Sequence, residues 1–520
     1  MAAASHYKRP ALAGFTADQR RRTTILFGNL TPKHEALIEA VFRGSGYLCE
    51  ALPTPDRDNC QTGKEFCNNG LCNPNYFTAG NLIDFLRRLR RRGMTAEEIA
   101  DRYLYFTIGG CGPCRFGMYE SEYREALRAA GFPDFRVFTF QSNTAIRDGS
   151  TQPGLQYTVN FGLGMLNALI LGDILCDTVY RIRPYEVVAG AADRALAECL
   201  GELAGFLRSR CGYEVFHPPR SGRLFNVLTF LGKARYHLSA ADWEAALLRA
   251  QARLNEVEVD WLQVKPVVKV TGEFYSALSE GEANYNLYRF LESEGAEVRT
   301  DPISNLILYW LHQARLDNRR RRGLRPGYWK KELLLGFCEW FWAWQYGRSA
   351  RRTGGLAGRL ERQAELARLG GNYYDVLTRG GEGYLIAARG LDTALRRDSH
   401  LLISVKPFGC MPATQADGVM AQVAADYPEL HFLPLETLGE GEVHALSRTQ
   451  MALHDAHKRA REEFETALQS AGRTLEEIRR HVQGRPEMRR PFYRFGGVPG
   501  VAGRAAQFVL HAALQMRQGR

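Results

Sequence analysis

The stretch Leu104-Tyr-Phe-Thr-Ile-Gly-Gly-Cys-Gly-Pro-Cys-Arg-Phe-Gly-Met118 shows how this chain is built. Its first five residues are apolar or β-branched, which is typical of a strand. Residues 116–130 follow with the spacing of a helix that Gly131 ends, and residues 135–140 form another strand-like run. Strand, helix and strand in this order predict a β-α-β unit whose strands are parallel.

The same alternation continues on both sides of this unit, so the sequence predicts two α/β units with mainly parallel sheets. Thr95 and Glu98 have the spacing of a capping box and predict the start of one of the helices. The other strand-like runs are residues 23–27, 264–271, 401–405 and 431–435, and helical spacing occurs at residues 33–43, 77–92, 95–102, 284–294 and 419–425.

The length of 520 residues is too great for one ordinary core and predicts several domains. We expect a first α/β domain over residues 1–159 and a helix-rich segment over residues 160–260. A second α/β domain covers residues 261–460 and contains a helical insertion at about residues 315–368, rich in arginine and tryptophan. The remaining residues, 461–520, are predicted to be helical.

Composition and charge are those of a soluble globular protein. Hydrophobic residues make up 45% of the chain, and the net charge of +11 comes largely from short arginine runs, which we interpret as solvated helix faces. The runs lack interleaved aromatic residues, so no nucleic-acid partner is expected.

The sequence gives no sign of a membrane or of secretion. Residues 161–180 are the most apolar stretch, but they include Asn167, Asp173 and Asp177, so we predict a buried helix and not a membrane span. The N-terminus does not resemble a signal peptide. We therefore expect a cytoplasmic protein. In that reducing compartment, clustered cysteines more often bind metals or take part in redox chemistry than form disulfides.

Six of the eleven cysteines are predicted to lie in three short loops marked by glycine and proline. Thiolates bind soft metals and iron–sulfur clusters, so three such segments from distant parts of the chain predict one metal centre. Cys72, Cys114 and Cys410 each precede a predicted helix, whose free N–H groups and positive dipole end favour a thiolate. The segments are residues 60–74 with Cys60, Cys67 and Cys72, residues 110–117 with Cys111 and Cys114, and residues 406–412 with Cys410.

The residues alone leave the kind of site open. The spacing of Cys111 and Cys114 suits a thioredoxin-like pair, half of a zinc site or a cluster loop, and any of the six cysteines could simply be buried. The other five cysteines occur singly on apolar patterns and are predicted to be core residues. No phosphate-binding loop with a following Ser or Thr, no H-E-x-x-H motif and no G-x-S-x-G elbow is present. Hydrolysis of ATP by this chain and serine-type hydrolysis are therefore not expected.

Four segments together resemble the 2-hydroxyacyl-CoA dehydratase superfamily, and most closely the iron–sulfur domain of large proteins related to acyl-CoA dehydratase activases. The resemblance implies two flavodoxin-like α/β domains with an oxygen-sensitive cluster in the cleft between them. It also implies that cysteines are the cluster ligands, and we assign Cys72, Cys114 and Cys410 to this role. The matching segments are GKEFCNNGLCNPNYFTAGNL (63–82), GGCGPCRFGMYESEYREAL (109–127), KVTGEFYSALSEGEANYNLYRFLESEGAEV (269–298) and KPFGCMPA (406–413).

The cluster implied by the resemblance is a [4Fe-4S] cluster or a double-cubane [8Fe-9S] cluster. The double cubane needs about three thiolates for each cubane. Cys60, Cys67 and Cys111 are the candidates for the additional three, and the presence of these extra cysteines near the first three favours the larger cluster.

The resemblance also implies a function. In that superfamily an ATP-hydrolysing activase supplies a low-potential electron, which is used to dehydrate a 2-hydroxyacyl-CoA or to reduce another small molecule. Because this chain lacks an ATPase part, its activase is expected to be a separate polypeptide. The expected function is that of a dehydratase-like lyase or an ATP-coupled reductase; the alternative is a non-enzymatic, cluster-carrying or zinc-stabilised component of a larger complex. A dimer is one option for its quaternary state.

Overall fold

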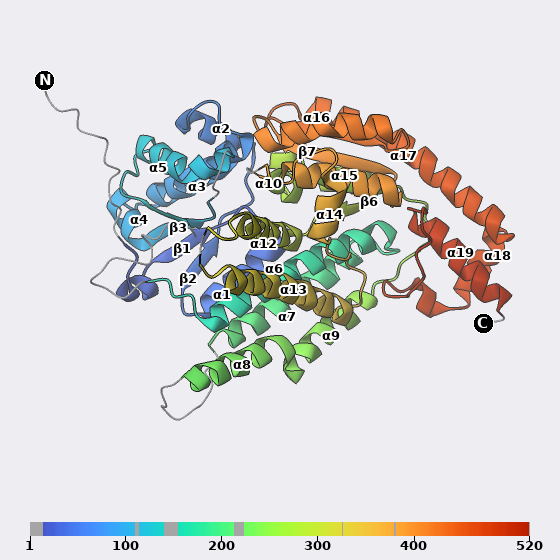
Figure 1. Cartoon of the computed structure of the whole chain (residues 1–520), viewed down its shortest axis with the longest axis horizontal. Coiled ribbons are helices and arrows are strands. Elements are labelled where there is room, and N and C mark those ends of the chain that lie inside the picture. Colours follow the sequence, from blue (N-terminus) through green and yellow to red (C-terminus); the bar gives the residue numbers. More distant parts are fainter. Residues whose placement is uncertain are drawn as a thin grey trace, which may run out of the picture.

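Two four-stranded sheets, both entirely parallel, organise the chain in the computed structural model. The structure describes residues 14–109, 114–139, 154–212, 223–324, 326–378 and 381–518. The N-terminal part, in blue, and the C-terminal part, in orange to red, lie side by side (Figure 1). The predicted α/β class with two flavodoxin-like domains and helical segments is confirmed.

The first sheet has the strand order β2-β1-β3-β4. Successive residues of each strand face two different cores, because neighbouring side chains of a strand point to opposite faces of the sheet. Ile25 and Phe27 of β1 are buried against α1 and against α6 (Val159–Ile182), whereas Leu26 between them is buried against α3 and α5. The strands are β1 (Thr24–Phe27), β2 (Leu48–Ala51), β3 (Tyr103–Thr107) and β4 (Arg136–Thr139), and the helices are α1 (Pro32–Gly44), α2 (Arg57–Phe66), α3 (Asn73–Arg91), α4 (Ala96–Arg102) and α5 (Tyr119–Ala129).

The second sheet repeats this order as β6-β5-β7-β8. Its inner strand β7 is mostly apolar and buried on both faces, as parallel strands covered by helices are. The strands are β5 (Val267–Gly272), β6 (Glu297–Thr300), β7 (Leu401–Pro407) and β8 (Phe432–Thr437). The helices after them include α10 (Phe274–Leu278), α11 (Leu287–Ser293), α12 (Ile303–Arg320), α13 (Tyr328–Arg352), α14 (Gln363–Gly370), α15 (Gly383–Arg396) and α16 (Met411–Asp426).

Helix α6 (Val159–Ile182) joins the two halves. It packs against α1 of the first half and against β6 and α12 of the second. Within the described part of the chain, the stretch Val159–Tyr185 is the one helical segment long and apolar enough to cross a membrane, and 67% of its apolar window is buried inside the molecule. The burial agrees with the buried helix predicted from Asn167, Asp173 and Asp177.

The remaining helices form the helix-rich middle and the C-terminal region. Helix α17 runs without a break through the boundary expected between residues 460 and 461. The middle helices are α7 (Ala191–Arg210), α8 (Arg223–Ser239) and α9 (Ala241–Asn255), and the C-terminal helices are α17 (Glu442–Ala471), α18 (Leu475–Gln483) and α19 (Arg504–Arg517).

Candidate functional site

Three of the predicted thiols occupy the same local position, the N-cap of a helix. Cys72 is the N-cap of α3, Cys410 is the N-cap of α16, and Cys114 is the N-cap of the short 3-10 helix η2 (Arg115–Met118) that leads into α5. Proline follows two residues after Cys72 and after Cys410, where its missing N–H does not interrupt the helical hydrogen bonds. The sequence-based placement of these thiols before helices is confirmed.

The loops that carry Cys72 and Cys410 touch, although one belongs to the first domain and the other to the second. The N–H of Asn73 donates to the carbonyl of Phe408 over 3.1 Å. A Cβ placed on Gly409, whose φ is +79°, would lie 3.5 Å from the Cα of Cys72 and 3.1 Å from Nη1 of Arg115. Arg115 follows Cys114 directly, so all three thiol segments meet where the domains join.

Two carboxylates lie at the same place. Glu273 follows β5 and caps α10 by accepting hydrogen bonds from the N–H groups of Tyr275 and Ser276. Glu382 precedes α15 and accepts the N–H of Phe274 over 2.8 Å. We refer to Cys72, Cys114, Cys410, Glu273 and Glu382 as the acidic group.

Members of the acidic group act on one another electrostatically. Burial raises the pKa of Glu273 to about 7, and the charge of Glu382 contributes to this shift. Burial and the charge of Glu273 raise the pKa of Cys410. The pKa of Cys72 is about 12, raised by burial and by Glu273 and Cys114, and lowered by the hydroxyl of Tyr119, which lies 2.8 Å from the sulfur.

Helix N-termini do favour the thiolates, as expected, but burial has the larger effect. The N–H of Phe116 lowers the pKa of Cys114 and the N–H of Ala413 lowers that of Cys410, yet burial raises both pKa values above the usual range. The helix N–H groups lower the thiol pKa values, as predicted. The net pKa shift is nevertheless upward, so the prediction of thiolates is wrong, because the depth of the site could not be read from the sequence.

Of the other three predicted ligands, Cys60 and Cys67 lie inside and at the end of α2, and not at the start of a helix. Cys60 lies inside α2, so the prediction that it belongs to a loop is wrong; it is 1% exposed and packs with Phe77 and Tyr275. Cys67 ends α2 and is buried beside Asn75, and burial followed by the charge of Glu122 raises its pKa to about 12. No member of the acidic group contributes to the pKa shift of Cys60 or Cys67. Cys111 lies outside the described residues.

The cysteines of the acidic group have the donor chemistry of iron–sulfur cluster ligands. Among the residues that the structure describes, no three His, Cys, Asp or Glu side chains are close enough to hold one metal ion. Three cysteines at helix N-termini, partly shielded from water, have the ligand chemistry and the nearby N–H groups that clusters use.

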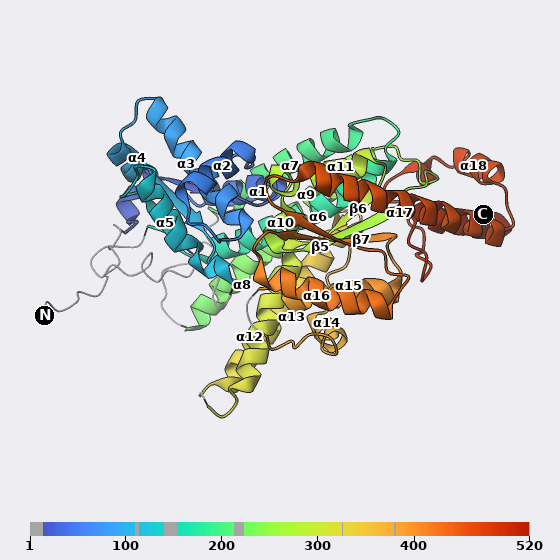
Figure 2. The same ribbon diagram turned by 90° about the horizontal axis from the view of Figure 1, so that it is seen from above.

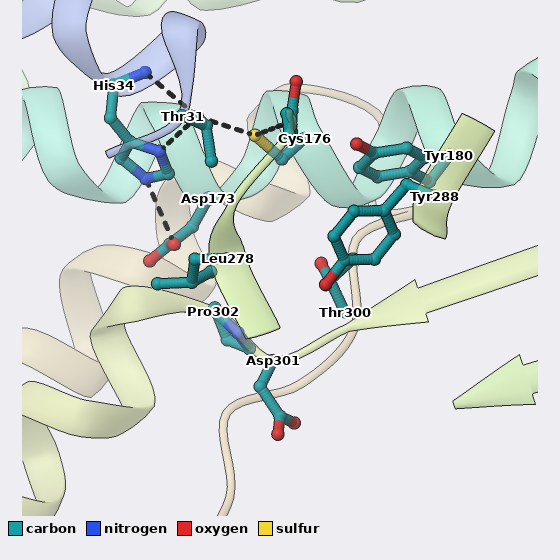
Figure 3. Close-up of a pocket in the computed structure, with 11 residues that line it drawn as sticks. Thr31, His34, Asp173, Cys176, Tyr180, Leu278, Tyr288, Thr300, Asp301 and Pro302 are labelled. Atoms are coloured by element: carbon teal, nitrogen blue, oxygen red, sulfur yellow. Dashed lines mark hydrogen bonds and ion pairs between the residues drawn. The ribbon is translucent and has the colours of Figure 1, made fainter. Parts of the chain in front are cut away.

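A second polar cluster links α1 to α6 (Figure 3). Asp173 of α6 contacts His34 of α1, with 3.2 Å between Oδ1 and Nε2, and Thr31 Oγ1 lies 2.7 Å from the other ring nitrogen. Cys176 lies 3.4 Å from the same hydroxyl. These residues line a cavity of about 10 Å³, which has room for about one water molecule.

The environment of His34 favours its charged form. Burial lowers the pKa of His34, but its hydrogen bonds to Asp173 and Cys176 outweigh burial and raise the pKa to about 10. Sequence reasoning missed this network, since the histidines are scattered and Cys176 was assigned to the core. It also missed Glu273 and Glu382, for which the available signals were a glutamate directly after a strand and another in a glycine-rich turn.

No protein-family model matches this chain, and no curated protein or solved structure is significantly similar to it.

Proposed function

We propose that this chain binds a [4Fe-4S] cluster at the junction of its two α/β domains, through the thiolates of Cys72, Cys114 and Cys410. The observation that carries the proposal is the meeting of three N-cap cysteines from both domains, with the Cys72 and Cys410 loops joined by a backbone hydrogen bond. Three thiolates would leave one iron open to a small substrate, as an open position does in catalytic metal sites.

The bound cluster would supply one-electron chemistry at low potential. The function we propose is that of the 2-hydroxyacyl-CoA dehydratase type: electrons come from a separate ATP-hydrolysing activase and serve the dehydration or reduction of a small substrate. The residues of this chain hold the thiolates, donate hydrogen bonds to them and limit the access of water. Cys72 and Cys410 are only 8% and 7% exposed, which supports the last of these roles.

Tyr119 has a defined part in this proposal. Its hydroxyl lies 2.8 Å from the sulfur of Cys72 and would donate a hydrogen bond to that thiolate. Hydrogen bonds to ligand sulfurs raise the reduction potential of a cluster, because they stabilise the added negative charge of the reduced form. Tyr119 would therefore tune the potential while remaining outside the set of iron ligands.

Iron analysis after anaerobic reconstitution tests the proposal. We expect about four irons and four sulfides per wild-type chain. The variants Cys72→Ala, Cys114→Ala and Cys410→Ala should each lose most of the iron, while Cys199→Ala and Cys211→Ala, which change buried core cysteines, serve as matched controls and should keep it. Equal iron in the wild type and the Cys114 variant would refute the proposal.

Two further measurements separate the alternatives. If Cys60, Cys67 and Cys111 also bind iron, the wild type should approach about eight irons, and replacing these three together should halve that number. Stoichiometric zinc, with no visible absorption after reconstitution, would identify a zinc-stabilised component. Turnover of 2-hydroxyacyl-CoA compounds with an activase and ATP separates an enzyme from a protein that only carries the cluster.

A further inference from the structure

Helices α12 and α13 form a hairpin whose end extends away from the rest of the molecule (Figure 2). Helix α13 exposes a row of large apolar side chains, which we call the aromatic stripe: Trp329, Leu333, Phe337, Trp340 and Trp344. Trp329, Leu333 and Trp340 are 63%, 71% and 58% exposed, values that are unusual for side chains of this size.

The stripe is one continuous face. Successive members are four, four, three and four residues apart, which places them on the same side of a helix over about 22 Å. The ring centroids of Phe337 and Trp340 are 5.8 Å apart, and those of Trp340 and Trp344 are 6.1 Å apart. Contacts between the rings keep this face ordered, so little side-chain freedom remains to be lost on binding.

Two further large apolar side chains of the hairpin are exposed. Leu324, in the connection between the helices, is 79% exposed, and Trp310 of α12 is 45% exposed. With side chains of this size about half exposed, the apolar surface amounts to roughly 700 Å², above the few hundred Å² of the largest patch on an ordinary monomer. A surface of this size indicates a site that another surface covers.

The charges around the aromatic stripe indicate which kind of partner surface could cover it. The end of the hairpin carries a set of exposed cations, which we call the basic tip: Arg319, Arg320, Arg321, Arg322, Lys330 and Lys331. In the described part of the hairpin, the three carboxylates already have arginine partners, since Asp317 pairs with Arg321, Glu332 with Arg315 and Arg319, and Glu339 with Arg315. A second copy of this hairpin would therefore bring the same cations and no unpaired carboxylate to receive them.

We propose that the hairpin docks on the surface of an anionic phospholipid bilayer. Tryptophan and tyrosine rings prefer the boundary between headgroups and acyl chains, and lysine and arginine extend from that depth to lipid phosphates. The aromatic stripe would enter the boundary and the basic tip would meet the headgroups. Peripheral contact of this kind requires no membrane-spanning segment, so it is compatible with the burial of α6.

Vesicle binding by the full chain tests this proposal. The probes are vesicles of phosphatidylcholine alone and of phosphatidylcholine with phosphatidylglycerol, assayed by co-sedimentation and by tryptophan emission. Five of the seven tryptophans lie on the hairpin, so insertion should shift the emission to shorter wavelength. We expect binding to the mixed vesicles, weak or no binding to phosphatidylcholine alone, and weaker binding at high salt.

Two variants address the two parts of the surface. Trp329→Ser with Trp340→Ser should lower the partition coefficient at least tenfold, because two exposed apolar side chains no longer enter the boundary. Lys330→Glu with Lys331→Glu should lower it more than tenfold, since each lysine near an anionic surface contributes roughly fivefold. Val187→Ser with Val188→Ser is the matched apolar control, and Lys458→Glu with Arg480→Glu is the matched charge control.

Several outcomes would overturn the proposal. One is a failure of the wild type to bind the mixed vesicles; another is unchanged binding by the tryptophan variant. Binding without an emission shift would show attraction of charges alone and no insertion of the stripe. A wild-type dimer in light scattering that the tryptophan variant converts to monomer would assign the stripe to a second copy. Iron content should be the same in the hairpin variants and the wild type, which keeps this test separate from that of the cluster.

Discussion

Replacing Asp173 with Asn removes one charge from the buried network that joins the domains. Asp173 is 2% exposed, and its carboxylate accepts the N–H groups of Ile303 and Ser304, over 2.7 and 2.8 Å, at the start of α12. It also faces His34 of α1. One side chain of α6 thus holds an element from each half of the molecule, and the substitution changes all of these contacts with almost no change in volume.

The cost of this substitution can be worked out from the hydrogen bonds. An asparagine has one acceptor oxygen, so its NH₂ group must face either the N–H of Ser304 or the N–H of Ile303 and the imidazole. At least one buried N–H then loses its acceptor, at a cost of about 1–3 kcal/mol. His34 also loses its charged partner, and breaking a buried ion pair from one side costs about 3–5 kcal/mol. Because His34 can become neutral in response, we expect about 3–5 kcal/mol in total.

Urea unfolding of the wild type and the Asp173 variant measures this difference in free energy. The pKa of His34 is raised from 6.5 to about 10 in the folded state. The stabilisation from its proton is therefore complete below about pH 6.5 and is lost as the pH rises through 10. The difference between the proteins should be largest near pH 6 and shrink toward pH 10. Asp193→Asn, at a 55% exposed side chain that pairs with Arg183, is the control and should cost less than about 1 kcal/mol. A loss below 1 kcal/mol for the Asp173 variant at pH 6 would refute the reasoning.

Two further changes test other parts of the structure. Burial raises the pKa of Glu297, but Arg504 and other cations outweigh it and lower the pKa to about 2, so the stability due to this carboxylate is present above pH 4.5 and is lost as the pH falls toward 2. Glu297→Gln should cost about 3 kcal/mol at pH 7 and remove that part of the acid dependence, as urea midpoints across this pH range would show; equal midpoints in both proteins at pH 7 would contradict it. Gly409→Ala and Gly46→Ala introduce the same left-handed strain, at φ values of +79° and +83°, and each should cost about 1–2 kcal/mol in thermal unfolding. Only the methyl group at residue 409 approaches the thiol loops, so only that variant should also lower reconstituted iron, and equal iron in the two variants would argue against a cluster there.

Strands with apolar sequences and helices with one apolar face could be predicted from the sequence. Short elements that bury few side chains could not. Strand β2 is only four residues long and only Cys49 in it is fully buried, so its pattern is too short to be recognised. Helix α2 is polar along most of its length, and it contains Gly63, a residue more typical of a loop than of a helix interior. In the structure this glycine allows α2 to pack directly on α3, since a Cβ there would lie 1.9 Å from the carbonyl oxygen of Tyr76. Contact between helix backbones leaves no periodic signal in the sequence.

The candidate site was only partly within reach of the sequence. A strand before Cys410 and prolines after Cys72 and Cys410 are local signals, and they placed these thiols at helix starts correctly. Glu273 and Glu382 are more than a hundred residues apart, and their approach depends on how α10 and α15 pack around β7. Burial depends on the same packing, which is why the direction of the thiol pKa shifts could not be obtained from helix position alone.

The raised pKa values bear on how the proposed cluster would be taken up. Cysteine binds iron as the thiolate, so iron must displace the protons that burial favours on Cys72, Cys114 and Cys410. The positive charge of bound iron would offset the repulsion between the thiolates and the carboxylates of Glu273 and Glu382, which oppose ionisation of the thiols. The N–H groups at the helix starts act in the same direction throughout. Uptake of iron by this site should therefore become more favourable as the pH rises, and the burial that opposes loading would afterwards protect the cluster from water.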